Sequence, residues 1–132
     1  MATIIDPQLS IQVDRASELV TVTATCGVEF TEVEVRSMNL LGLRYTLECH
    51  LLDRETIYPE AVIDFAAQQF PPVRDGARAY EQPVFEASAK RKDLHLYVFG
   101  KDTVAAELRL SNEDVGTLSV KRTPTTLVDL AA

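Results

Sequence analysis

Two long stretches of alternating apolar and polar residues constrain the fold of this chain more than any other feature. Over residues 20–30, valine, alanine, cysteine and phenylalanine occupy every second position, and mostly threonine and glutamate lie between them. Residues 43–52 repeat the pattern, with leucine, tyrosine and cysteine on one parity. Successive side chains of a β-strand point to opposite faces, so a period of two predicts strands with one buried and one solvated face. Such half-buried strands are typical of antiparallel sheets.

Shorter alternations elsewhere complete the predicted architecture. They indicate further strands over residues 9–14, 84–89, 94–99, 104–111 and 118–120, with turn signals between them. Roughly eight strands at about ten-residue spacing predict an all-β fold, an antiparallel β-sandwich forming a single domain over residues 1–132. The pattern resembles immunoglobulin-like sandwiches in architecture, although the chain has no tryptophan. The resemblance carries no function with it.

Some segments are less clear. Val33 and Val35 alternate with charged residues and are expected to prolong the second strand, before a loop over residues 37–42 that ends in a turn glycine. Residues 59–70 fit a short helix that begins at a proline, but they also alternate as a strand would, and both interpretations stay open. Gly27 interrupts its strand on the outer face and predicts a bulge or a close backbone approach. The tail from residue 125 onward is read as helical or frayed.

Charge and cysteine content narrow the classes of partner and location. The net charge is −7, and residues 1–66 carry eleven acidic residues against four basic ones. An acidic chain repels phosphate groups, so we expect no nucleic acid and no membrane as partner. The amino-terminal residues lack the features of a signal peptide, which makes the cytoplasm the expected location. Cys26 and Cys49 both lie on the apolar parity of their strands, and we expect two reduced core thiols rather than a disulfide.

Residues that carry chemistry are few, so we expect a protein that is not an enzyme. Glu48 and His50 share the polar face of one strand and offer an acid–base pair, but the local spacing supplies no third metal ligand. No glycine-rich phosphate-binding motif and no nucleophile motif occurs in the sequence. We therefore predict no catalytic residues, no metal and no cofactor.

The leading functional hypothesis is a protein-interaction or assembly module, with a protein partner or a second copy of the chain as ligand. Strand 94–99 has apolar residues on both faces, which predicts coverage within the monomer, at a subunit interface or by a ligand in a pocket. Leu40, Leu41 and Leu52 are expected to be exposed, and they add apolar surface that a partner could cover. The interface candidates are Leu40, Leu41, Leu52, His95, Tyr97 and Phe99.

The alternative hypothesis is a β-sandwich that binds a small ligand, calcium or a carbohydrate through the region 53–82. That region contains the longest irregular stretch of the chain, and functional residues concentrate on loops held by rigid scaffolds. The ligand-binding candidates are Asp53, Glu55, Tyr58 and Tyr80.

Overall fold

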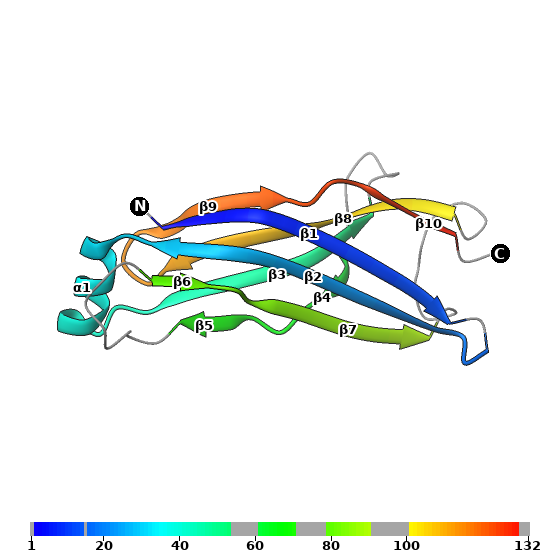
Figure 1. Ribbon diagram of the computed structural model, residues 1–132, viewed down its shortest axis with the longest axis horizontal. Coiled ribbons are helices and arrows are strands. Elements are labelled where there is room, and N and C mark those ends of the chain that lie inside the picture. Colours follow the sequence, from blue (N-terminus) through cyan, green and yellow to red (C-terminus); the bar gives the residue numbers. More distant parts are fainter. Residues whose placement is uncertain (1, 15, 54–60, 71–78, 91–100, 130–132) are drawn as a thin grey trace.

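A computed structural model describes residues 2–14, 16–53, 61–70, 79–90 and 101–129, which form two antiparallel sheets packed face to face (Figure 1). The strands are β1 (Thr3–Asp14), β2 (Leu19–Phe30), β3 (Tyr45–Asp53), β4 (Ala61–Asp64), β5 (Gln68–Phe70), β6 (Ala79–Glu81), β7 (Val84–Lys90), β8 (Lys101–Asn112), β9 (Gly116–Arg122) and β10 (Thr126–Asp129). The helix of this described part is α1 (Glu32–Leu41). The predicted all-β antiparallel sandwich is confirmed.

The first sheet is centred on β2, which pairs with β1 along one side and with β6 and β7 along the other. β6 and β7 keep one common register against β2, so they form a single strand position interrupted at Gln82 and Pro83. A proline has no N–H group to donate to the ladder, which explains the interruption.

The second sheet is centred on β3 and β8, which pair from Tyr45 opposite Asn112 to Asp53 opposite Val104. β4 and β5 follow one another along the free side of β3, and β10 and β9 do the same along β8. The strands of the described residues therefore occupy three positions in one sheet and four in the other. Seven positions in two sheets match the architecture of a constant-type immunoglobulin sandwich.

The core lies between the two sheets and uses the residues that the alternation predicted. All apolar positions of β2 from Val20 to Phe30 are buried, and so are the tyrosine, leucines and cysteine on the inner parity of β3. Phe30 lies edge-on to Tyr45 and to Phe70, with ring centroids 5.0 and 5.5 Å apart. Edge-to-face aromatic pairs at this distance add about 0.5–1.5 kcal/mol beyond the burial of their area. The aromatic contacts therefore join both sheets near α1.

Helix α1 corrects the expectation that residues 33–35 prolong a strand and that residues 37–42 form a loop. The Thr31 side chain accepts from the Glu34 backbone N–H, and the Glu34 carboxylate accepts from the Thr31 backbone N–H, which is a capping box. Val35 and Met38 are buried on one side of the helix. Gly42 then ends it with a left-handed φ of 68°. The alternation of Val33 and Val35 was misleading. In the helix, Val35 is buried together with Met38, three residues further on, and Val33 is exposed.

The conformation of two further segments follows from their pairing with neighbouring strands. Of the ambiguous range 59–70, the described part contains strands β4 and β5 and a short non-helical link between them, so the helical interpretation is wrong there. β10 pairs with the start of β8, which replaces the helical or frayed tail with a strand over Thr126–Asp129. No helix among the residues that the structure describes is long and apolar enough to cross a membrane.

Candidate functional site

Helix α1 lies across one end of the sandwich (Figure 1). Several of its apolar side chains are exposed to solvent. Val33, Leu40 and Leu41 are 69%, 76% and 78% exposed. Val33 and Leu40 are about two helical turns apart and therefore lie on one face of the helix. The predicted exposure of Leu40 and Leu41 is confirmed, and the structure adds Val33. We call these three residues the end patch.

The other sequence-predicted residues do not join the end patch. Leu52 is half-buried on the outer face of β3 rather than fully exposed. Asp53 is the last residue of β3, and Tyr80 lies in β6. Their roles as ligand-binding residues stay predictions. The remaining candidates, His95, Tyr97, Phe99, Glu55 and Tyr58, lie outside the described residues.

The Glu48–His50 pair is part of a row of charged groups across the outer face of the second sheet. His50 Nδ1 lies 2.6 Å from Asp64 Oδ1 on β4, and His50 Nε2 lies 3.9 Å from Glu48 Oε2. On β8, Glu107 is the register partner of His50. In the part of the chain that the structure describes, no three His, Cys, Asp or Glu side chains are placed to hold a metal ion.

Glu107 continues this row toward β9 through its contacts with two arginines. Its carboxylate lies 2.8 Å from Arg122 Nη2 and 3.4 Å from Arg109 Nη2. Burial opposes its ionisation, but the hydrogen bonds and charges of Arg122 and Arg109 outweigh burial and lower the pKa of Glu107. Side-chain contacts in this row therefore connect β4 to β3 through Asp64 and His50, and β9 to β8 through Arg122 and Glu107. Cross-strand pairs of this kind stabilise a sheet.

The two cysteines have the properties of core residues. Both are buried and free, and burial raises the pKa of the Cys26 thiol to about 11. Burial, together with the neighbouring Cys26, raises the pKa of Cys49 to about 12. The thiolate is the reactive form of cysteine, so neither residue is activated as a nucleophile at neutral pH.

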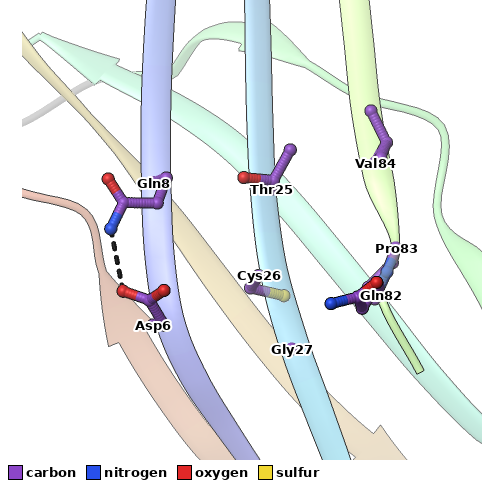
Figure 2. Close-up of a pocket in the computed structure, with 8 residues that line it drawn as sticks. All are labelled: Asp6, Gln8, Thr25, Cys26, Gly27, Gln82, Pro83 and Val84. Carbon is purple, nitrogen blue, oxygen red and sulfur yellow. Dashed lines mark hydrogen bonds between the residues drawn. The ribbon is translucent and has the colours of Figure 1, made fainter. Parts of the chain in front are cut away.

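A pocket of about 290 Å³ lies on the outer face of the first sheet, over Gly27 in the middle of β2 (Figure 2). Gly27 has the same parity as Thr25 and Glu29, and its missing side chain leaves a hollow in this row. Three strand positions contribute to the wall. The lining residues are Asp6, Gln8, Thr25, Cys26, Gly27, Gln82, Pro83 and Val84.

The sheet is interrupted on both sides of β2 at the level of the pocket. The β1 register shifts by one residue between Ile5 and Gln8, so that Asp6 and Pro7 together oppose Cys26. The bulge expected at Gly27 therefore lies in the neighbouring strand, where Asp6 has a left-handed φ of 47°. On the other side lies the break between β6 and β7. Cys26 consequently has no registered partner on either side among the described pairings.

Polar groups from both neighbouring strands face each other across the pocket. Asp6 Oδ1 accepts a hydrogen bond of 2.8 Å from Gln8 Nε2, and Figure 2 shows this pair on one side of β2. From the other side the Gln82 carboxamide reaches toward Cys26 and Gly27. Thr25 adds a hydroxyl group next to Gly27. Of the predicted ligand-binding region 53–82, this pocket contains Gln82, a residue that the sequence analysis did not single out.

Comparison with known proteins identifies related folds and no family. No protein-family model matches the chain, and no curated protein matches its sequence. A candidate β-galactosidase from Bacteroides fragilis matches 96% of this chain with a TM-score of 0.58 and 12% identity. A bacterial adhesin from Mobiluncus mulieris, which contains disulfide, isopeptide and ester cross-links, matches 93% with a TM-score of 0.56 and 12% identity.

These similarities concern the fold alone. The chain spans 19% of the length of the β-galactosidase and 49% of the length of the adhesin. Both matches agree with the predicted sandwich class, and β-rich folds of this kind occur within longer proteins of different activities.

Proposed function

We propose that the chain is a non-enzymatic protein-interaction or assembly module, and that a second copy of the chain binds at the α1 end. The end patch is the observation that carries this proposal. Val33, Leu40 and Leu41 are large aliphatic side chains, each more than two-thirds exposed on a short helix. Burial of apolar area against a partner is favourable by roughly 25 cal/mol per Å².

The surroundings of the end patch fit a protein contact. Arg36 and Glu32 form an exposed ion pair of 3.1 Å on the same helix, which supplies a polar rim next to the apolar residues. An apolar centre with a polar rim is the usual composition of a protein interface. Three side chains cover less than the roughly 1,000 Å² of a stable interface, so we propose a weak or transient contact unless further strands contribute.

The remaining chemistry supports a role without catalysis. The raised pKa values of Cys26 and Cys49 argue against a thiolate nucleophile. His50 Nδ1 is engaged in a 2.6 Å hydrogen bond with Asp64 Oδ1, which supports a structural role for this side chain. The fold similarity to parts of an adhesin and of a candidate β-galactosidase is compatible with a module inside a larger assembly. The net charge of −7 disfavours nucleic acid as the partner.

Light scattering on a sizing column over a wide concentration range tests the proposal. We expect the mass of the wild-type chain to rise above the monomer value of 14.6 kDa with concentration. A double substitution, Leu40→Glu with Leu41→Glu, should keep the chain monomeric, because burying two carboxylates in the contact is costly. Val120→Glu is the matched control, since Val120 is 42% exposed on β9 of the second sheet.

Either of two results would contradict this proposal. If the wild-type chain stays at the monomer mass at every concentration, a second copy is not the partner. If wild type and the double variant associate equally, the end patch is not the contact surface. Circular dichroism of each variant confirms that the sandwich is intact before the masses are compared.

A further inference from the structure

We infer that the pocket over Gly27 is a binding site for one ring of a neutral saccharide. The inference is independent of the protein contact proposed for α1, because the pocket lies on the outer face of the first sheet and shares no residue with the end patch. It also differs from the ligand site expected in the region 53–82, since most of its lining belongs to β1 and β2.

The volume sets the size of the ligand. Pockets for drug-sized ligands span about 300–1,000 Å³, and this pocket of about 290 Å³ lies at the lower limit. It is an open hollow rather than a closed cavity, because its floor is the backbone of β2 at Gly27 and its walls are side chains of neighbouring strands (Figure 2). A single sugar ring at the end or on the side of a glycan fits an open hollow of this size.

The polar lining sets the chemical class. Gln8 and Gln82 each offer carboxamide donors and acceptors, Thr25 offers a hydroxyl group, and Asp6 offers acceptors. Sugar hydroxyl groups also donate and accept, so each can pair with this set. Among the residues that the structure describes, the lining contains no lysine or arginine, which disfavours phosphate and carboxylate ligands. A single carboxylate is also a poor calcium site, since Ca²⁺ takes six to eight oxygen ligands.

The apolar part of the lining completes the match. Val84 is 52% exposed at the rim, and the neighbouring Pro83 is buried. Val84 therefore offers aliphatic surface to the C–H groups of a sugar ring. The described lining residues include no aromatic ring on which a nucleobase could stack, which disfavours a nucleoside.

The backbone is irregular on both sides of the pocket. A non-glycine residue at a left-handed φ, such as Asp6, costs of order 1 kcal/mol. Pro7 and Pro83 remove two ladder donors at the same level of the sheet, on opposite sides of β2. Bulges next to binding sites re-aim side chains, and here the bulge places Asp6 within hydrogen-bonding distance of Gln8 at the pocket wall.

NMR titration of the ¹⁵N-labelled full chain with methyl glycosides of glucose, galactose, mannose and N-acetylglucosamine tests this inference. We expect at least one sugar to shift the amide signals of Gln8, Gly27 and Gln82 with a dissociation constant in the range of about 1–10 mM. Repeating the titration with an oligosaccharide of the same sugar distinguishes a free monosaccharide from a glycan as the source of the ring.

Two variants and two probes make the test specific. Gly27→Val fills the hollow and should weaken sugar binding at least about tenfold, since valine suits an outward strand position and Gly27 has no positive φ. Thr23→Val, on the same outer face of β2 but outside the lining, should bind as the wild type does. Gln82→Ala replaces an exposed side chain and provides a second test if Gly27→Val does not fold.

Three results would overturn the inference. The first is the absence of any shift at about 50 mM of each sugar, a concentration that detects even very weak binding. The second is sugar binding that neither Gly27→Val nor Gln82→Ala weakens. The third is a response of the same amides to inorganic phosphate or calcium chloride at lower concentrations than to any sugar, which would assign the pocket to an ion.

Discussion

Replacing Glu34 by alanine is the most direct test of how α1, which carries the end patch, is held on the sandwich. The Glu34 carboxylate accepts from the Thr31 backbone N–H at 3.1 Å, from the Thr31 hydroxyl at 2.9 Å, from the Ala2 N–H at 2.6 Å and from the Tyr45 hydroxyl at 3.2 Å. One side chain therefore joins the start of the helix to β3 and to the residue before β1.

The expected cost follows from the loss of the acceptor for these donors. A hydrogen bond to a charged group contributes about 1.5–3 kcal/mol, but the donors around Glu34 are only part-buried, and water replaces some of what is lost. We expect Glu34→Ala to lower the free energy of unfolding by about 2–3 kcal/mol. Urea denaturation followed by circular dichroism measures this difference.

Glu32→Ala is the matched control, because it removes the same side chain from the same helical turn. Glu32 has an exposed ion pair with Arg36, and such a pair contributes about 0.3–0.5 kcal/mol. If the two variants lose the same stability, within about 0.5 kcal/mol, the reasoning about the Glu34 contacts is refuted.

The pH dependence gives a second test of Glu34. Burial opposes its ionisation, but the bonds from Thr31 and Ala2 outweigh burial and hold the pKa below the ordinary value of 4.5. The folded chain therefore binds this proton more weakly than the unfolded chain does. The stabilisation is complete above pH 4.5 and is lost as the pH falls through the lower folded-state pKa. The difference between wild type and Glu34→Ala should shrink below pH ~4, and a constant difference would contradict the assignment.

Three further expectations follow from other parts of the molecule. Thr123→Val removes the hydroxyl that accepts from the buried Ala106 N–H at 2.9 Å. The free energy of unfolding, measured by urea denaturation, should fall by about 1–3 kcal/mol. Unchanged stability would show that this N–H finds another acceptor. Gly42→Ala should lower the stability by about 1–2 kcal/mol in thermal unfolding, because φ is +68°. Nothing lies within 4 Å of an added Cβ atom, so a much larger loss would contradict this reasoning. Cys26 and Cys49 should resist alkylation at pH 7 until the chain unfolds, because burial raises their pKa to about 11 and about 12; fast labelling of the native chain would contradict this.

The end patch was partly predictable from the sequence. Leu40 and Leu41 were identified as exposed apolar residues, but they were placed in a loop. The capping-box pattern of Thr31 and Glu34 was present in the sequence and indicates a helix start, yet the alternation of valines with glutamates beside it favoured a strand. Whether Val33 is exposed or buried depends on whether this segment is a helix or a strand, so the third member of the end patch was missed.

The pocket was not predictable, although one of its residues was noticed. Gly27 was recognised as an interruption of β2, but a hollow forms only where the β1 bulge and the break at Pro83 meet the same point of β2. Those residues lie far apart in the sequence, and strand register brings them together. No local pattern carries that information.

Local periodicity by itself determined the class of fold, because the sheet turns every second residue toward the core, and this repeat was visible over residues 20–30 and 43–52. It also determined which face of β2 and β3 is buried. Only the tertiary structure decided the short strands β4, β5 and β10, since three or four residues carry too little periodic signal and their conformation follows from the ladders they join. The same holds for the pairing of His50 with Asp64 and for the pocket over Gly27, where the contacts cross between strands and no spacing along the chain specifies them.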